Sequence, residues 1–224
     1  MVNFRLRLIL PWAFALVFAL TRWPGLLPPN FSAAYALVFC AGALLPGRLG
    51  WALPFGAMLV TDLVLNLYYR ISGGWDVFTG TGLLFLAMNY LGYAALFGLG
   101  RAFGLKARFL TLLGGGLLGA VLFYLVTNTA AWLFNPFRNP EYTRDLFGWI
   151  VALTKGTGGY PQTWEFFRNT LLSGGLFTAL FAGSWKLTSA ESPSEKGEES
   201  EPAEEPQGEA RSEKRGTRSG WILG

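Results

Sequence analysis

The sequence contains no histidine and only one cysteine, Cys40, and these two absences exclude several classes of site. Without histidine there is no Ser-His or Cys-His catalytic pair, no His-ligated haem and no His-based metal site. One cysteine forms no internal disulfide, and Cys40 lies in an apolar run that favours a buried side chain. A phosphate-binding GxxxxGK[ST] loop is also missing. We therefore predict a protein that is not an enzyme and uses no metal and no cofactor.

Charged residues are scarce as well. They make up 14% of the chain, against about 25% in a typical globular protein. Hydrophobic residues make up 52% of the chain, and its mean hydropathy is +0.35. Single arginines interrupt apolar runs, whereas a nucleic-acid interface needs clustered basic residues. This composition predicts an all-α integral membrane protein, with membrane lipids as partners and no nucleic acid.

Six apolar runs are candidates for membrane spans, which need about 20 residues each. They are Leu6 to Leu20, Phe31 to Leu45, Trp51 to Tyr69, Val77 to Gly100, Phe109 to Phe134 and Phe166 to Trp185. The first two are short for a span. From Ser189 onward the composition changes to Ser, Glu, Pro, Gly, Lys and Arg, which is typical of disorder. The sequence thus predicts a six-helix transmembrane bundle over residues 1–188 and a disordered cytoplasmic tail over residues 189–224.

The basic residues favour one orientation of this bundle. With the N-terminus inside, the cytoplasmic stretches carry Arg5, Arg7, Arg48, Arg101, Lys106 and Arg108. The short outer loops carry only Arg22 and Arg70. Because cytoplasmic loops are enriched in Lys and Arg, we predict that both termini are cytoplasmic.

The long outer loop from Asn135 to Glu165 contains a helical pattern. Its apolar residues Leu146, Trp149, Ile150 and Leu153 fall on one face. This pattern predicts an amphipathic helix at the outer membrane surface or at the end of the bundle.

Polar side chains inside the spans are candidates for a binding site, because an ionisable group at membrane depth is costly. Asp62 is the only acid well inside a span, and Asn66 lies one turn further along the same face. With Asn128, Arg168 and Asn169 they lie at comparable heights in the outer half of the bundle. We predict that these residues bind a substrate in one cavity, that Arg168 is the counter-charge for Asp62, and that the loop with Trp149 closes the site. The alternative is that each amide makes its own packing bond.

Four strings together carry a family resemblance. They are Leu27-Pro28-Pro29-Asn30-Phe31-Ser32, Thr61-Asp62, Phe123-Tyr124-Leu125-Val126-Thr127-Asn128 with Trp132 after it, and Phe166-Phe167-Arg168-Asn169-Thr170-Leu171-Leu172. The chain resembles, over about residues 20–183, an uncharacterised bacterial membrane family labelled as putative transport proteins. That family is similar to the substrate-binding S components of energy-coupling factor (ECF) transporters. Its members usually have Gly-Asp after the last string, where this chain has Ser173-Gly174.

The resemblance implies a component of the bacterial cytoplasmic (inner) membrane that captures a small molecule from the outer side. Delivery would require a transmembrane coupling subunit and separate ATPases. A small-residue face on the first helix of S components contacts the coupling subunit, which implies this role for Ala15 and Ala19. The alternative is a structural or accessory subunit of a larger membrane complex, with the charged tail as a docking arm.

Overall fold

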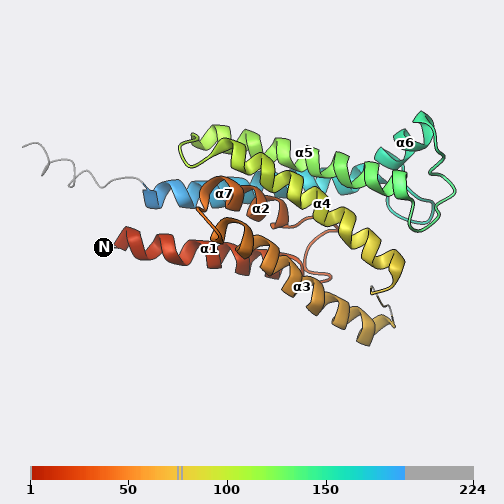
Figure 1. The fold of residues 1–224 in the computed structure, drawn as a ribbon, viewed down its shortest axis with the longest axis horizontal. Coiled ribbons are helices and arrows are strands. Elements are labelled where there is room, and N and C mark those ends of the chain that lie inside the picture. The colour runs from red at the N-terminus through yellow and green to blue at the C-terminus, as the bar shows by residue number, and fades with distance from the viewer. Residues whose placement is uncertain (1, 75, 77, 190–224) are drawn as a thin grey trace, which may run out of the picture. The chain divides into compact units, whose positions relative to one another are not determined.

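The computed structural model describes residues 2–74, 76 and 78–189, and every regular element in this part of the chain is an α-helix (Figure 1). The helices are α1 (Val2–Thr21), α2 (Ala34–Leu44), α3 (Leu49–Gly73), α4 (Gly80–Phe103), α5 (Phe109–Phe134), α6 (Leu146–Leu153) and α7 (Thr163–Ser189). The tail predicted to be disordered lies outside the described residues from residue 190 onward.

Local capping residues set several helix ends. The α3 helix stops at Gly74, which has a φ of +67° and donates its N–H to the Tyr69 carbonyl. The α4 helix begins after Thr79, whose hydroxyl accepts the Gly82 N–H at 3.1 Å. The α5 helix ends at Asn135, in the left-handed conformation that asparagine tolerates better than most residues. The α3 and α4 helices each extend about one turn beyond the predicted C-terminal ends of their spans, while the α5 bounds coincide with the prediction.

The short α2 helix is the centre of the bundle. Each of its eleven residues is buried, and α1, α3, α4, α5 and α7 pack around it (Figure 1). At 1.5 Å per residue it is about 16 Å long, half the roughly 30 Å of a bilayer core. Among the described residues, α3, α4 and α5 are long and apolar enough to cross a membrane, whereas the apolar parts of α1 and α2 are shorter.

Glycines allow α2 to approach α4 at backbone distance. A Cβ atom on Gly42 would lie 2.6 Å from the Phe97 carbonyl oxygen, and Gly100 of α4 lies against Phe39 of α2 in the same way. The GxxxG pair of α5 also packs inside the bundle, because Gly115 faces the Phe39 and Phe103 rings and Gly119 faces Leu96. Small residues therefore set the tight helix contacts within this chain.

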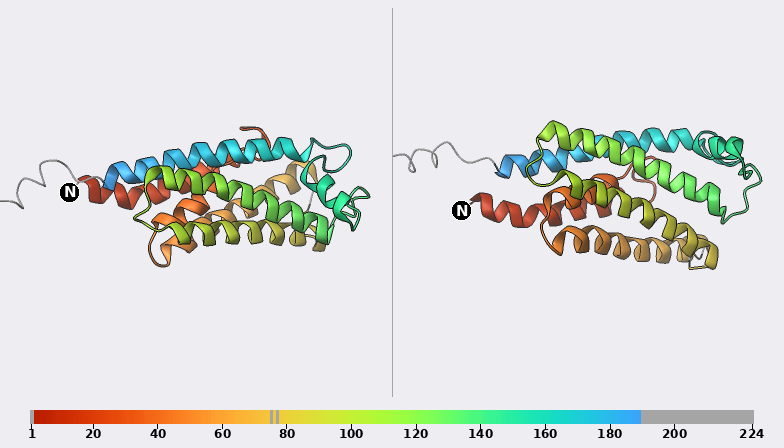
Figure 2. Two further views of the ribbon diagram at one scale, coloured as in Figure 1. Left: turned by 90° about the horizontal axis from the view of Figure 1, so that it is seen from above. Right: turned by 45° about the horizontal axis from the view of Figure 1, so that its top comes forward.

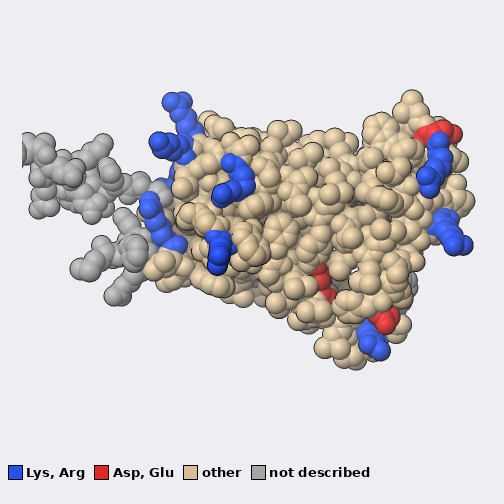
Figure 3. All heavy atoms as spheres, in the orientation of Figure 1, with Lys and Arg blue, Asp and Glu red and all other residues tan. Residues whose placement is uncertain are grey.

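The outer faces of the helices are strongly apolar. On α3 alone, Leu59, Val60, Leu63, Val64 and Leu67 are each about half exposed. A water-soluble monomer rarely exposes an apolar patch this long. In the face shown in Figure 3, basic side chains gather near one end of the bundle and side chains of both signs near the other, and the surface between them is uncharged apart from one small acidic patch.

The helices run alternately in opposite directions, apart from α6. The start of α1 and the end of α7 lie at one end of the bundle, and α6 lies at the opposite end, as both views in Figure 2 show. The acidic residues among the described positions are Asp62, Asp76, Glu141, Asp145 and Glu165. Asp62 belongs to the middle of α3, and the other four belong to segments near the α6 end. Among the described residues, the charged side chains at the end with the start of α1 are therefore all basic.

Candidate functional site

One ion pair joins α3 to the chain just after α1. An Arg22 Nη2 atom lies 2.6 Å from Asp62 Oδ1, and this is the only ion pair within the part of the chain that the structure describes. Arg22 Nη1 also donates to the Thr61 hydroxyl at 2.9 Å. The Tyr90 hydroxyl of α4 donates to the other carboxylate oxygen, Asp62 Oδ2, at 2.8 Å. We call Arg22, Thr61, Asp62 and Tyr90 the Arg22 cluster.

The Arg22 cluster lies near the middle of the long helices. Asp62 is eleven residues before the end of α3, and Tyr90 is ten residues after the start of α4, distances of about 16 and 15 Å along the helices. The α1 helix stops at this level. Its last residue, Thr21, accepts the Ala33 N–H at 3.0 Å and so ties together the two ends of the connection to α2. Arg22 therefore reaches Asp62 because α1 ends well short of the end of α3.

Aromatic rings surround the charged groups. The Arg22 guanidinium lies 5.6 Å from the centroid of the Phe18 ring, close enough for a cation–π interaction. Tyr90 contacts Tyr93, which packs on Phe123 with ring centroids 4.6 Å apart. The side chains of Arg22 and Asp62 keep 23% and 15% of their surface exposed, so the pair is partly rather than fully buried.

The structure places the predicted site residues in several different contacts. Asn66 is buried on the side of α3 that carries Asp62. The Asn169 amide of α7 donates to the Pro29 carbonyl at 2.9 Å, while the Asn128 amide donates to Tyr124 of its own helix at 2.9 Å. Asp62, Asn128 and Asn169 thus bond to different partners, and none of these partners is shared. Their joint role in substrate binding stays a prediction.

The expected pairing of Arg168 with Asp62 is wrong, because Arg22 occupies that position. The Arg168 guanidinium instead lies 5.7 Å from the Trp164 ring, and its Nε is 3.5 Å from Asn169 Oδ1. The pattern of basic residues predicts Arg22 in an outer loop, and no sequence pattern singles out Tyr90. The available sequence signal for the position of Arg22 was the shortness of the first apolar run. A short helix ends part-way along its longer neighbours, so the residue after it lies beside the middle of α3.

The predicted helix in this loop is present as α6, and the structure shows which of its residues face the bundle. The residues buried against the bundle are Gly148, Val151 and Ala152, whereas Leu146 and Ile150 are exposed. A helix packs closely through its small residues, which is why the bulkier side chains point away. Trp149 donates its indole N–H to the Thr129 hydroxyl of α5 at 3.0 Å, and Tyr124 donates to the carbonyl of Leu153.

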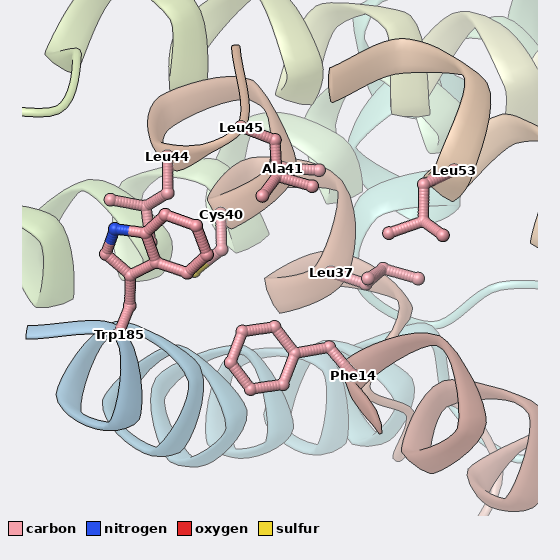
Figure 4. Close-up of a pocket in the computed structure, with 8 residues that line it drawn as sticks. All are labelled: Phe14, Leu37, Cys40, Ala41, Leu44, Leu45, Leu53 and Trp185. Atoms are coloured by element: carbon pink, nitrogen blue, oxygen red, sulfur yellow. The ribbon is translucent and has the colours of Figure 1, made fainter. Parts of the chain in front are cut away.

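Two cavities of the structure are lined by residues other than the predicted site residues. A small apolar one lies between α1, α2, α3 and α7, beside Phe14, Cys40 and Trp185 (Figure 4). Its volume of about 10 Å³ is too small for an organic ligand. Ala15 packs against the neighbouring buried cluster of Ala41, Leu45 and Leu53, and a contact of Ala15 and Ala19 with a partner stays a prediction. The second cavity is a groove of about 520 Å³ beside α6.

A family described as "Family of unknown function (DUF6580)" matches residues 2–195. The chain belongs to this family. The DUF6580 match covers all seven helices and therefore includes the Arg22 cluster and the α6 groove. No curated protein and no solved structure matches the chain.

Proposed function

We propose that this DUF6580 protein is a substrate-binding component for small-molecule uptake in the bacterial inner membrane, and that the Arg22 cluster is the centre of its binding site. The observation that carries the proposal is the Arg22–Asp62 pair midway along apolar helices. A charged side chain at the bilayer centre costs about 2.5–3.5 kcal/mol even on insertion scales, and such residues usually mark functional sites.

The architecture supports a six-helix bundle in the membrane. The helices α1 to α5 and α7 alternate in direction, and the end with the start of α1 and the end of α7 carries only basic residues among the described positions. The positive-inside rule then puts this end, and both termini, in the cytoplasm. The α6 end faces outward, where substrate is captured.

The contacts of the Arg22 cluster suggest how a ligand binds. Both Asp62 oxygens are already satisfied, one by Arg22 and the other by Tyr90. A ligand with an acid group accepts the Tyr90 hydroxyl in place of Asp62 Oδ2 while Arg22 stays on Asp62, so the two protein charges stay paired throughout. The rings of Tyr93 and Phe123 then supply an apolar wall.

The other predicted residues fit the entry route to this centre. Asn128 lies six residues before the end of α5, and Asn169 lies six residues after the start of α7, each about 9 Å from the outer end of its helix. Arg168 neighbours Asn169, and Trp149 lies on α6, where it is hydrogen-bonded to Thr129 of α5. A ligand passes these groups before it reaches Asp62 and Asn66. Release to the cytoplasm is assigned to a coupling subunit and separate ATPases.

Native mass spectrometry of the full chain in lipid nanodiscs tests the proposal. We expect a reproducible non-lipid ligand after incubation with a bacterial metabolite extract. The Tyr90→Phe variant removes one hydroxyl without changing shape, and it should weaken binding by about tenfold, the value of one hydrogen bond to a charged group. Tyr69→Phe on the exposed face of α3 is the matched control. A ligand-free spectrum under all conditions, or stoichiometric recovery in a large membrane assembly, would overturn the uptake role.

A further inference from the structure

The groove beside α6 has the size and lining of a small-molecule site. Its volume of about 520 Å³ lies within the roughly 300–1,000 Å³ typical of ligand pockets. The apolar part of the lining comes from Phe147 and Val151 of α6 and from Tyr160 of the following loop. Phe147 and Tyr160 are 69% and 70% exposed, so these two aromatic side chains are available to a ligand.

Glu141 supplies a fixed negative charge in this groove. Its Oε1 atom accepts the Gly158 N–H at 2.9 Å, and this hydrogen bond lowers the pKa of the carboxyl group. The other oxygen, Oε2, is buried and has no hydrogen-bond partner among the residues that the structure describes. A buried carboxylate oxygen without a partner carries a desolvation cost that a donor would relieve.

Lys155 supplies a positive charge to the same groove. It is exposed, and it forms no ion pair with Glu141, since the described part of the chain contains only the Arg22–Asp62 pair. Opposite charges that line one groove without contacting each other favour a ligand that carries both signs. A simple cation would meet repulsion from Lys155, and a simple anion would meet repulsion from Glu141.

We propose that the α6 groove binds a small zwitterion of the amino-acid class, with its ammonium group on the Glu141 carboxylate and its carboxylate on Lys155. The aliphatic part of the ligand packs against Phe147 and Tyr160. This site is separate from the Arg22 cluster and does not depend on the proposed uptake function.

Isothermal titration of the full chain in nanodiscs tests the proposal with probes of matched length. The probes are ω-amino acids from glycine to 8-aminooctanoate, together with hexylamine and hexanoate. We expect saturable binding of at least one amino acid and binding at least about tenfold weaker for both singly charged probes, because each lacks one charge-assisted contact. Equal binding of charged and zwitterionic probes, or no saturable binding of any amino acid, would refute the site.

Two variants separate recognition from loop folding. Glu141→Gln also changes the acceptor for Gly158, so Lys155 is the cleaner position. Lys155→Glu should change the preference from the best-binding ω-amino acid to the α,ω-diamine of the same chain length, because the groove then presents two carboxylates. Lys186→Gln, at the other end of the bundle, should leave binding unchanged. An unaltered preference in Lys155→Glu contradicts the proposal, whereas Tyr90→Phe reports only on the Arg22 cluster.

Discussion

At the scale of single residues, the decisive feature is a charge pair whose two members come from helices of different length. Asp62 sits in the middle of α3, and Arg22 reaches it from the end of the shorter α1. Removing one member of such a pair leaves the other charge without a partner inside the bundle. The free energy of unfolding is therefore expected to fall more in a single variant than in the double variant.

The Arg22–Asp62 pair yields a stability prediction. Asp62→Leu alone should lower the free energy of unfolding by about 3 kcal/mol, the low end for a broken buried pair because both side chains are partly exposed. The double variant Arg22→Met with Asp62→Leu should recover at least about 1 kcal/mol of this loss. Thermal or denaturant unfolding in mild detergent measures both. Strict additivity of the two single changes would contradict direct pairing.

Two carboxylates in the segment between α5 and α6, Glu141 and Asp145, yield a pH prediction. The Gly148 N–H donates to Asp145 at 2.7 Å, and the Gly158 N–H donates to Glu141 at 2.9 Å. These backbone hydrogen bonds lower both pKa values from their usual 3.8 and 4.5. A carboxylate with a lowered pKa stabilises the fold above its ordinary pKa, and this stabilisation is lost as the pH falls through the lowered value.

Amide chemical shifts of the two glycines measure this effect. In a pH titration of isotopically labelled protein, the Gly148 amide should change with a midpoint below 3.8 and the Gly158 amide with a midpoint below 4.5. A midpoint at or above either value would show that the corresponding hydrogen bond is not maintained in solution.

At the scale of helices, apolar runs alone did not distinguish a buried helix from a membrane span. The run at Phe31 to Leu45 reads as a short span, yet only Ala34–Leu44 is helical and all of it is buried. Periodicity carries no information on this point when every face is apolar. The same ambiguity explains α6, whose existence is predictable but whose inner face is determined by Gly148 and Ala152 rather than by its largest side chains.

The close contact between α2 and α4 yields a packing prediction. Gly42→Ala places a methyl group against the Phe97 carbonyl and should destabilise the protein by about 1–3 kcal/mol, as overpacking does. The matched control is Gly98→Ala, also on α4, where a Cβ meets no atom within 4 Å. The control should be neutral or stabilising by up to about 1 kcal/mol, because alanine is the better helix former. Comparable effects at both positions would argue against the close helix contact.

At the scale of the whole molecule, composition was enough to predict an all-helical protein with apolar outer faces, and the fifth span was predicted to the residue. The partner of Asp62 was not predictable in this way. It depends on how far α1 extends beside α3 and on which helices meet in the bundle, and the choice between Arg22 and Arg168 follows from that arrangement alone.

The orientation of the bundle in the membrane yields the last prediction. Arg48 and Ser72 lie at the two ends of α3, and both are exposed, so differences in labelling cannot arise from burial. In a Cys40→Ala background, Ser72→Cys should react with a membrane-impermeant maleimide in intact cells, and Arg48→Cys should react only after permeabilisation. The reason is that, within the part of the chain that the structure describes, the charged residues at the end with Arg48 are all basic, which favours the cytoplasmic side. Permeabilised cells provide the control, since both variants should then react fully. Labelling of position 48 in intact cells would reverse the orientation and with it the outward position of the α6 groove.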